Sequence, residues 1–256
     1  MSEALSIRVA GAEINGRPRD LTRPWGLFVQ KGGLQGWGGL PAGRREALAR
    51  AVAHGEHDVP VYLPSRVVTI DGWAIEETPT KLQRLIERVR GLAATGDRNR
   101  FVVAEWGLSR WADSRRMSCD ADGVGRGYGK YVHAGFQLQF VCPDPRKYGD
   151  VATLPESGTA TSIPVFHYGT FPAFPRVEIP SAPAAYTITS PGGTFTVAGA
   201  TAGGTHVVDL RRGRVYRNGV EMPGVGRGDL WAVPVGAAWT HTLSVAGRIR
   251  IADTFV

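Results

Sequence analysis

The sequence predicts a mainly β protein of two domains, with one helix inside the first domain. One stretch, from Thr78 to about residue 94, has the 3.6-residue apolar period of an amphipathic helix. It lies between two β-like segments, 59–75 and 100–106. After Asp150 the helix signals stop, and short β-branched or aromatic runs alternate with Gly, Pro and Asn-Gly turns. We therefore place the domains at residues 1–149 and 150–256.

The first strands and loops follow from local composition. Residues 5–9 and 25–29 are rich in β-forming residues, with a turn at 14–16 between them, so two strands are expected. Glycines surround Trp37 within 30–43, which predicts a long loop. Residues 44–53 suit a short helix that buries Leu48 and Val52.

The central helix has a clear beginning and end. Thr78 can cap the first turn, and Pro79 suits the first helical position because it has no amide proton to lose. Gly96 can supply a left-handed stop. The apolar face, which must pack on a sheet, consists of Leu82, Leu85, Ile86, Val89 and Ala93.

The strands beside the helix are predicted from their β-branched and aromatic residues. Asp71-Gly72 interrupts the first of them, which indicates a turn or bulge and hence a hairpin. Residues 101–104 form a short apolar run that suits a buried strand. The polar, glycine-rich segment 110–130 is a second expected loop, and long loops in compact domains commonly contact something else.

The end of the first domain alternates apolar and polar residues over 131–142, as an amphipathic strand does. Pro143 and Pro145 then stop regular structure, because each removes an amide and disfavours helix at the residue before it. Beyond them, many short strands at near-regular spacing predict an antiparallel sandwich.

Bulk properties exclude several classes of protein. No stretch approaches the roughly 20 apolar residues of a membrane span, and Met1 does not begin a signal peptide, so cytosolic synthesis is expected. The net charge is +7, but the basic residues are mostly arginine and scattered, which argues against a nucleic-acid site. Cys119 and Cys142 are expected to be free thiols.

Motifs for chemistry fail on inspection, so no catalytic residue, metal site or cofactor is expected. The glycines of 123–130 lack the spacing of a phosphate loop, and Asp120 begins a calcium-like loop without its closing glutamate. His54 and His57 have no third ligand nearby. A pair of carboxylates for sugar hydrolysis is not excluded by the sequence, since the two residues of such a pair come together only in the folded protein.

Aromatic residues of the second domain raise a separate possibility. Trp231 and Trp239, with Tyr216 and Phe195, are candidates for a sugar-stacking platform. Aromatic residues on strands more often belong to the core, and we favour that interpretation here.

Several segments together resemble the distal tail proteins of long-tailed, non-contractile bacteriophages, over essentially the whole chain. The more specific pieces are the Pro-Asp-Pro-Arg-Lys-Tyr-Gly run at 143–149 and the strand-Trp-x-x-Pro-x-Gly ending at 230–236. The other segments are 66–72 with the helix after it, 168–175, 208–211 and 216–219.

The resemblance implies a virion structural protein at the distal end of the tail, and not an enzyme. Its first domain would have the fold of a tail-tube subunit and close into a ring of six copies. Its second domain would be a galectin-like or carbohydrate-module-like sandwich. The implied partners are further copies of the chain, the tail-tube protein, the tail-tip hub and the tape-measure protein, with DNA only as passing cargo.

Two alternatives stay open beside the ring protein: a carbohydrate-binding or receptor-binding component acting through the second domain, and a glycosidase. A ring subunit needs loops or sheet edges that neighbouring copies complete. The loops at 30–43 and 110–130 are therefore the expected contact segments. The candidate contact residues are Trp37, Arg110, Trp111 and Arg115.

Overall fold

The computed structural model of the chain describes residues 5–18, 24–121, 126–128 and 131–256. The chain divides into two compact units, Met1–Lys147 together with Val256, and Tyr148–Phe255. We call them the first and the second unit. Within the described residues the mainly β prediction is confirmed, since α1 is the one helix among many strands.

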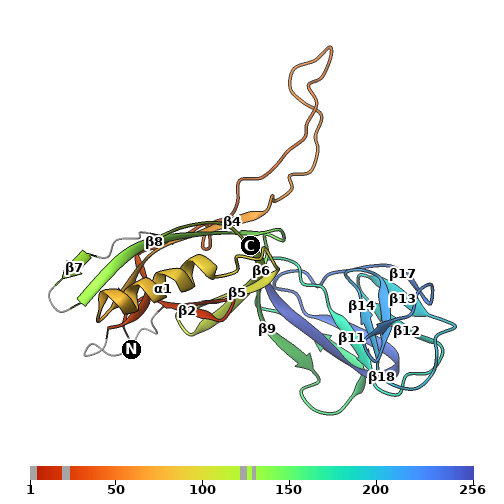
Figure 1. Cartoon of the computed structure of the whole chain (residues 1–256). Helices are drawn as coiled ribbons and strands as arrows, with labels where there is room; N and C mark the ends of the chain where they lie inside the picture. Colours follow the sequence, from red (N-terminus) through yellow and green to blue (C-terminus); the bar gives the residue numbers. More distant parts are fainter. Residues whose placement is uncertain (1–4, 19–23, 122–125, 129–130) are drawn as a thin grey trace. The chain divides into compact units, whose positions relative to one another are not determined.

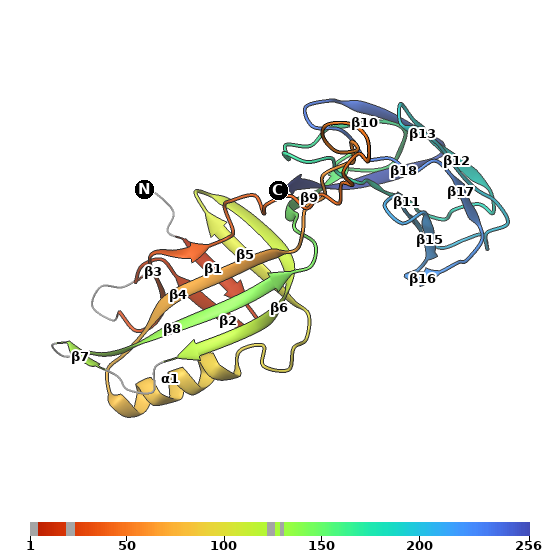
Figure 2. The same cartoon turned by 90° about the horizontal axis from the view of Figure 1, so that it is seen from above.

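The first unit is a barrel. Its elements are β1 (Ser6–Val9), β2 (Ala12–Asn15), β3 (Gly26–Gln35), β4 (Arg66–Glu76), α1 (Pro79–Gly91), β5 (Asn99–Glu105), β6 (Leu108–Ala121), β7 (Arg126–Tyr128) and β8 (Tyr131–Cys142). Following paired neighbours gives a closed circuit, β1–β2–β3–β4–β8–β6–β5 and back to β1. All pairs are antiparallel except β2 with β3. In Figure 2, β4 and β8 run side by side as the longest ladder, from Arg66 opposite Cys142 to Glu76 opposite Val132.

The barrel core is built by alternation along β4 and β8. Val68 and Ile70 of β4, and Leu138 and Phe140 of β8, are fully buried, while the residues between them face outward. This is the period of two that a strand imposes. The amphipathic strand expected at 131–142 is thereby confirmed.

Helix α1 packs against β4, β6 and β8 with Leu82, Ile86 and Val89 buried (Figure 1). The predicted start is confirmed, because the Thr78 hydroxyl accepts a hydrogen bond from the Lys81 amide at 3.3 Å. The helix ends earlier than expected, at Gly91. The first left-handed residue after it is Ala93, with φ of 52°, three positions before Gly96.

The expected turn at Asp71-Gly72 is wrong, because β4 runs through it without a break. The irregularity lies in the neighbouring strand β3, between Val29 and Leu34. A Cβ on Gly72 would overlap the Phe136 ring and lie 2.5 Å from the Phe28 carbonyl oxygen. The absence of a side chain at Gly72 therefore lets the neighbouring strands approach closely at this point of β4.

Three other expectations for the first unit are corrected. Residues 12–15 form β2, so three strands open the chain, and part of the expected loop at 30–43 is the end of β3. The expected loop at 110–130 is largely β6, which pairs with both β5 and β8. Its polar residues suit a strand with one wet face. The remainder of that loop, at 122–125 and 129–130, lies outside the described residues.

The second unit consists of two sheets that share one long strand, β18 (Trp239–Phe255). Its other strands are β9 (Lys147–Leu154), β10 (Ala160–Val165), β11 (Arg176–Ile179), β12 (Tyr186–Ser190), β13 (Gly193–Val197), β14 (His206–Asp209), β15 (Arg214–Arg217), β16 (Val220–Glu221) and β17 (Gly226–Gly228). One sheet has the order β10–β18–β12–β13–β17, and the other β18–β11–β14–β15–β16.

Some strand boundaries of the second unit differ from those expected. The two strands expected at 241–245 and 248–251 are one continuous strand, β18. Residues 230–233 form no strand and make only an isolated bridge from Val233 to Ala173. The prolines do not stop regular structure as far as residue 149, because β9 begins at Lys147.

Candidate interaction surface

The first unit carries a projecting segment, residues 40–64 between β3 and β4, which we call the arm (Figure 1). Its two legs are joined by paired hydrogen bonds between the backbones of Arg44 and Tyr62, at 2.7 and 2.9 Å. Nearer the tip, the His57 amide donates to the Leu48 carbonyl at 2.9 Å. The helix predicted at 44–53 is therefore wrong, because the chain pairs across the arm.

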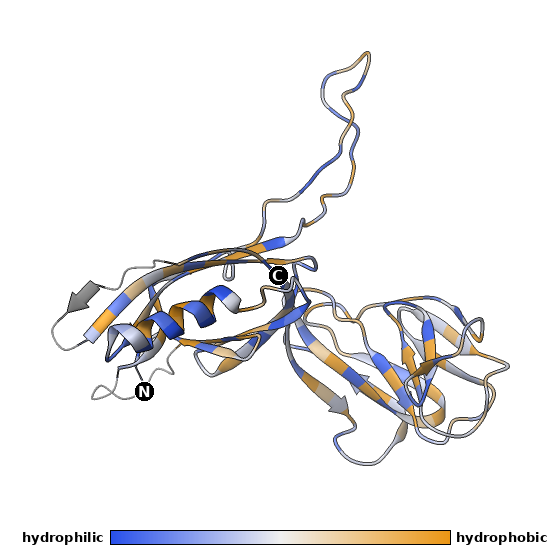
Figure 3. Cartoon of the chain, in the orientation of Figure 1, coloured by the Kyte–Doolittle hydropathy of each residue, from blue (hydrophilic) through white to orange (hydrophobic). Residues whose placement is uncertain are grey.

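The arm has almost no interior. Figure 3 shows hydrophobic and hydrophilic residues mixed along its length. Val52 is 100% exposed and Leu48 74%, which overturns the expectation that both are buried. Ordering a chain segment costs conformational entropy that burial of apolar groups normally offsets. The other large apolar side chains exposed on the arm are Leu40, Val61 and Tyr62.

Charges on the arm pair with one another. The Arg45 guanidinium lies 3.2 Å from the Glu56 carboxylate and 3.6 Å from that of Asp58, on the opposite leg. Exposed ion pairs contribute little free energy, so these contacts mainly align the legs. The arm contains three arginines and three acidic residues, and so carries no net charge apart from its histidines.

The base of the arm is anchored by two buried cations. Arg66 is fully buried, and its Nη1 donates to the carbonyls of Gly36 at 2.7 Å, Trp37 at 3.0 Å and Gly39 at 2.5 Å. The Lys147 ammonium donates to the Trp37 carbonyl at 3.0 Å. Burial lowers the pKa of Lys147 to about 8, and neighbouring Arg66 acts in the same direction. These bonds fix the point where the chain leaves β3.

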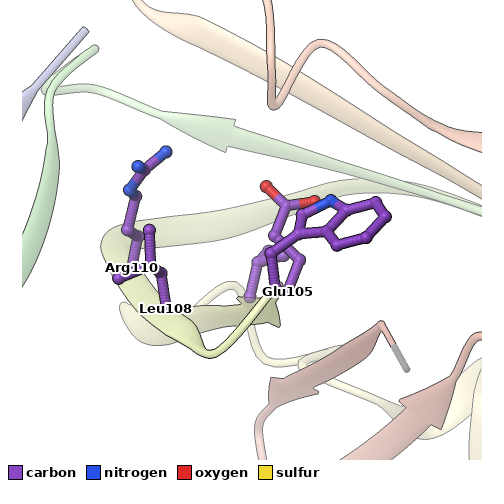
Figure 4. Close-up of a pocket in the computed structure, with 5 residues that line it drawn as sticks. Glu105, Leu108 and Arg110 are labelled. Carbon is purple, nitrogen blue, oxygen red and sulfur yellow. The ribbon is translucent and has the colours of Figure 1, made fainter. Parts of the chain in front are cut away.

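A second exposed apolar feature lies at the turn between β5 and β6. Trp106 is 77% exposed and has φ of 54°, a left-handed conformation that a bulky residue rarely adopts. Leu108 is 57% exposed beside it. A hollow of about 90 Å³ opens there, lined by Val103, Glu105, Trp106, Leu108 and Arg110. Figure 4 shows Glu105, Leu108 and Arg110 around it. We call this the Trp106 turn.

The expected ring-contact residues occupy different environments. The Trp37 ring is buried and packs on Phe101 with centroids 5.5 Å apart, so it offers no surface to a neighbour. Arg110, Trp111 and Arg115 lie on β6, not in a loop. The Arg100 guanidinium stacks 3.9 Å from the Trp111 ring centroid, and Arg115 donates to the Gly96 carbonyl at 2.5 Å.

The sugar-stacking candidates lie in or against the core of the second unit. Trp231 is buried, and its indole N–H donates to His241 Nε2 at 3.0 Å. The other His241 nitrogen then carries a proton and faces the Trp239 carbonyl at 3.2 Å. Trp239 is half-buried against the same core, and Phe195 is buried within it. The core interpretation therefore fits Trp231 and Phe195.

The described residues contain no group of three or more His, Cys, Asp or Glu side chains placed to hold a metal ion. His54 and His57 lie on the exposed arm. The loop at 123–130 lies mostly outside the described residues. In the same described part, no helix has the length and apolar character needed to cross a membrane.

The sequence did not predict that the apolar side chains of the arm and the Trp106 turn are exposed. Leu48 and Val52 have helical spacing, which hid their exposure. Pro41, Gly43 and Pro60 were the available signals against a packed element there. The Trp106-Gly107 pair was a turn signal placed within an otherwise apolar run.

No family model matches the chain, and no curated protein matches its sequence. Among solved structures it is similar to the SPP1 Dit (gp 19.1) protein, described as a paradigm of the hub adsorption apparatus in phages infecting Gram-positive bacteria. The identity is 18% and the TM-score 0.71, over 98% of this chain and 99% of that chain. A chain of the phage P2 baseplate in its activated conformation with Ca is 9% identical with a TM-score of 0.50, over 97% and 98%. The expected resemblance to distal tail proteins is thus confirmed at the level of the fold.

Proposed function

We propose that this chain is a structural, non-enzymatic component of a bacteriophage tail tip, where copies of it form a ring that joins the tail tube to the tail-tip hub. The observation that carries the proposal is the fold likeness to the SPP1 Dit protein, which spans nearly all of both chains. A chance likeness of one common domain would cover only one of the two units. The finer parts of the proposal are six copies, passage of tape measure and DNA through the lumen, and a galectin-like second unit.

The first unit has features that suit a ring subunit. Its barrel is closed, so it offers few open sheet edges for assembly. In the loops that the structure describes, exposed large apolar side chains lie on the arm and at the Trp106 turn. A contact between two different surfaces of identical subunits closes into a ring when the rotation between them permits. The chain thus offers loop contacts suited to such assembly.

The carbohydrate-binding alternative has less support. A sugar-stacking platform needs exposed aromatic faces, and Trp231 is 4% exposed with its N–H bonded to His241. A glycan array with the full chain tests this alternative directly. Binding that is lost in Trp239→Ala but retained in Trp111→Ala would favour it.

The ring is tested with the purified full-length chain. Native mass spectrometry and negative-stain electron microscopy should show closed homo-oligomers with a central opening. Antibodies against the chain should label the distal tail end in particles of the phage that encodes it. A chain that stays monomeric at high concentration and is absent from purified tails would contradict the proposal.

A further inference from the structure

We infer that the second unit binds a linear anionic polymer of the bacterial cell surface, with a phosphate or carboxylate in each repeat, on the outer face of its sheet β18–β11–β14–β15–β16. The choice of a cell-surface polymer rests on the proposed function at the tail tip. That the ligand is anionic follows from charge and strand register alone.

The arginines of the second unit gather on this sheet. Residues 148–255 contain eight arginines, no lysine and seven acidic residues, so the unit is nearly neutral as a whole. Five exposed arginines lie on the outer face of the sheet or on its β14–β15 turn. We call them the arginine face: Arg176, Arg211, Arg212, Arg214 and Arg250. They are scattered along the sequence, and the fold brings them onto one surface.

Strand register places three of these arginines in one row. Arg250 of β18 lies opposite Arg176 of β11. Arg176 lies opposite Asp209 of β14, which in turn lies opposite Arg214 of β15. Figure 2 shows β18, β11 and β15 of this sheet. Val177, next to Arg176, is buried in the core, so the row faces away from the core. Neighbouring strands are about 4.8 Å apart, so the row extends about 14 Å across the sheet.

The row carries more positive than negative charge. Asp209 is 4% exposed and forms an ion pair with Arg176 at 2.9 Å, and Arg214 pairs with Glu221 at 2.7 Å. In the part of the chain that the structure describes, Arg250 forms no ion pair, although it lies directly opposite Arg176. Like charges directly opposite each other on two strands are destabilising. An anion bound between Arg176 and Arg250 would remove this repulsion.

The β14–β15 turn extends the positive surface beside the row. The Asp209 carboxylate accepts a hydrogen bond from the Arg211 amide at 3.0 Å, and the Asp209 carbonyl accepts one from the Gly213 amide at 2.8 Å. These bonds fix the turn that carries Arg211 and Arg212. The arginine face thus sets five cations against the two carboxylates that pair with it.

The spacing of the arginines favours an anion that is repeated along a chain. A planar guanidinium can donate two parallel hydrogen bonds to one phosphate or carboxylate. One such anion can bridge Arg176 and Arg250, but Arg214 lies two strands beyond Arg176. A linear polymer that lies along the row can contact all three.

The same row disfavours single-stranded nucleic acid as the ligand. Proteins that bind single strands without sequence preference stack the bases on aromatic side chains. None of the four row residues is aromatic, and Tyr216 in the next row is half-buried. A tail tip also meets the surface of its host before DNA leaves the particle, so a cell-surface polymer is the polyanion that it meets first.

The test measures binding of three probes to the immobilised full-length chain by biolayer interferometry: poly(glycerol phosphate), polygalacturonate and neutral dextran. At least one of the two anionic probes should bind at about 50 mM salt, and its affinity should fall roughly tenfold by about 200 mM, because binding releases counterions. Dextran should not bind. The anionic probe that binds more tightly identifies the anion as phosphate or carboxylate. Poly(dT) at the same charge concentration should bind more weakly than that probe.

Two substitutions each remove one exposed charge from the arginine face. Arg250→Gln and Arg212→Gln should each weaken binding of the anionic probe about fivefold and reduce its salt dependence by about one contact. The matched control is Arg227→Gln, which removes the same charge from an exposed position of β17 in the other sheet. It should leave the affinity unchanged. Circular dichroism checks that all three variants keep the fold.

The outcomes separate this inference from the proposed function. An equal loss of affinity in all three variants, a loss in none of them, or tighter binding of poly(dT) overturns the inference. A chain that forms rings but binds neither anionic probe also overturns it and leaves the proposed function intact. A chain that binds through the arginine face, but stays monomeric and is absent from tails, overturns the proposed function and with it the choice of a cell-surface polymer.

Discussion

At the scale of single residues, the main features of the first unit are two cations held without exposure to water. Arg66 and Lys147 are 0% and 3% exposed, and both donate to the Trp37 carbonyl. Removing charge from water is costly, and backbone carbonyls offset only part of that cost. The pKa of Lys147 falls to about 8 for this reason, since burial favours the neutral amine.

Lys147 should therefore make stability depend on pH. The unfolded side chain titrates near pH 10.4, so between pH 8 and 10 the unfolded state binds more protons than the folded state. The free energy of unfolding should rise by about 1 kcal/mol from pH 8 to pH 9 on account of this group. Chemical denaturation at both pH values measures the rise.

The same experiment needs two variants for comparison. Lys147→Met should lose this rise, whereas Lys81→Met, at an exposed lysine, should keep it. Burial raises the pKa of Cys142 to about 11, so this thiol lowers the free energy of unfolding as the pH rises through the ordinary thiol value. Comparing each variant with wild type over the same interval cancels this contribution. An equal slope in wild type and Lys147→Met would refute the assignment.

Gly72 provides a second test at this scale. Gly72→Ala should destabilise the protein by about 1–3 kcal/mol, because the new methyl group would overlap the Phe136 ring and the Phe28 carbonyl. Thermal and urea unfolding measure the change. Gly91→Ala is the control, since nothing lies within 4 Å of its position and alanine favours the end of α1. Equal effects of the two substitutions would contradict the close approach.

At the scale of elements, the period of the apolar residues predicted the helix and strands that pack on the core. Amino-acid composition did not predict which segments pair as strands. α1 and β8 were predictable because Leu82, Ile86 and Val89, and the alternation along β8, record burial directly in the sequence. β6 was predicted as a loop because it is rich in polar residues. These residues suit a strand with one face toward water, and composition alone does not show that the segment pairs with β5 and β8.

The candidate site was less predictable than the fold. That the long segments between strands are contact surfaces stays a prediction. Of the four contact residues named, Trp37 is buried, and Arg110, Trp111 and Arg115 lie on β6. The Trp37 ring is buried against Phe101, and Arg66 and Lys147, distant in sequence, bind its carbonyl. Val52 is exposed because the chain pairs across the arm instead of coiling. Both results depend on contacts between distant segments, which local patterns do not report.

The cap of α1 gives a prediction for an element. Thr78→Ala should cost about 1 kcal/mol of stability, because the Lys81 amide loses its acceptor. Thr80→Ala, at the second residue of the helix, should leave stability unchanged or raise it slightly. Urea denaturation of the two variants compares them under the same conditions. A loss of stability in Thr80→Ala equal to that in Thr78→Ala would show that the cap bond contributes nothing specific.

At the scale of the whole molecule, two separate cores are evident. The cluster around Phe101, Leu138 and Phe140 contains only residues of the first unit, and the cluster around Ile188 and Phe195 only residues of the second. Each core is thus assembled from one continuous part of the chain. Units of this kind can fold alone.

Separate fragments test that independence. Residues 1–147 and 148–256 should each give a cooperative urea transition and a circular dichroism spectrum rich in strand. The cut follows Lys147 so that its bond to the Trp37 carbonyl stays in the first fragment. A fragment that is unfolded alone but structured when mixed with the other would show that the units depend on one another.

Strand β18 has a consequence for how the protein is made. It is the last strand along the chain, and it supplies hydrogen-bonding partners to β10, β11 and β12 in two different sheets. While the ribosome has not yet released residues 239–255, those three strands lack a neighbour that they later acquire. The second unit can therefore complete its folding only after residues 239–255 have been synthesised, and until then its nascent strands are open to mispairing with other chains.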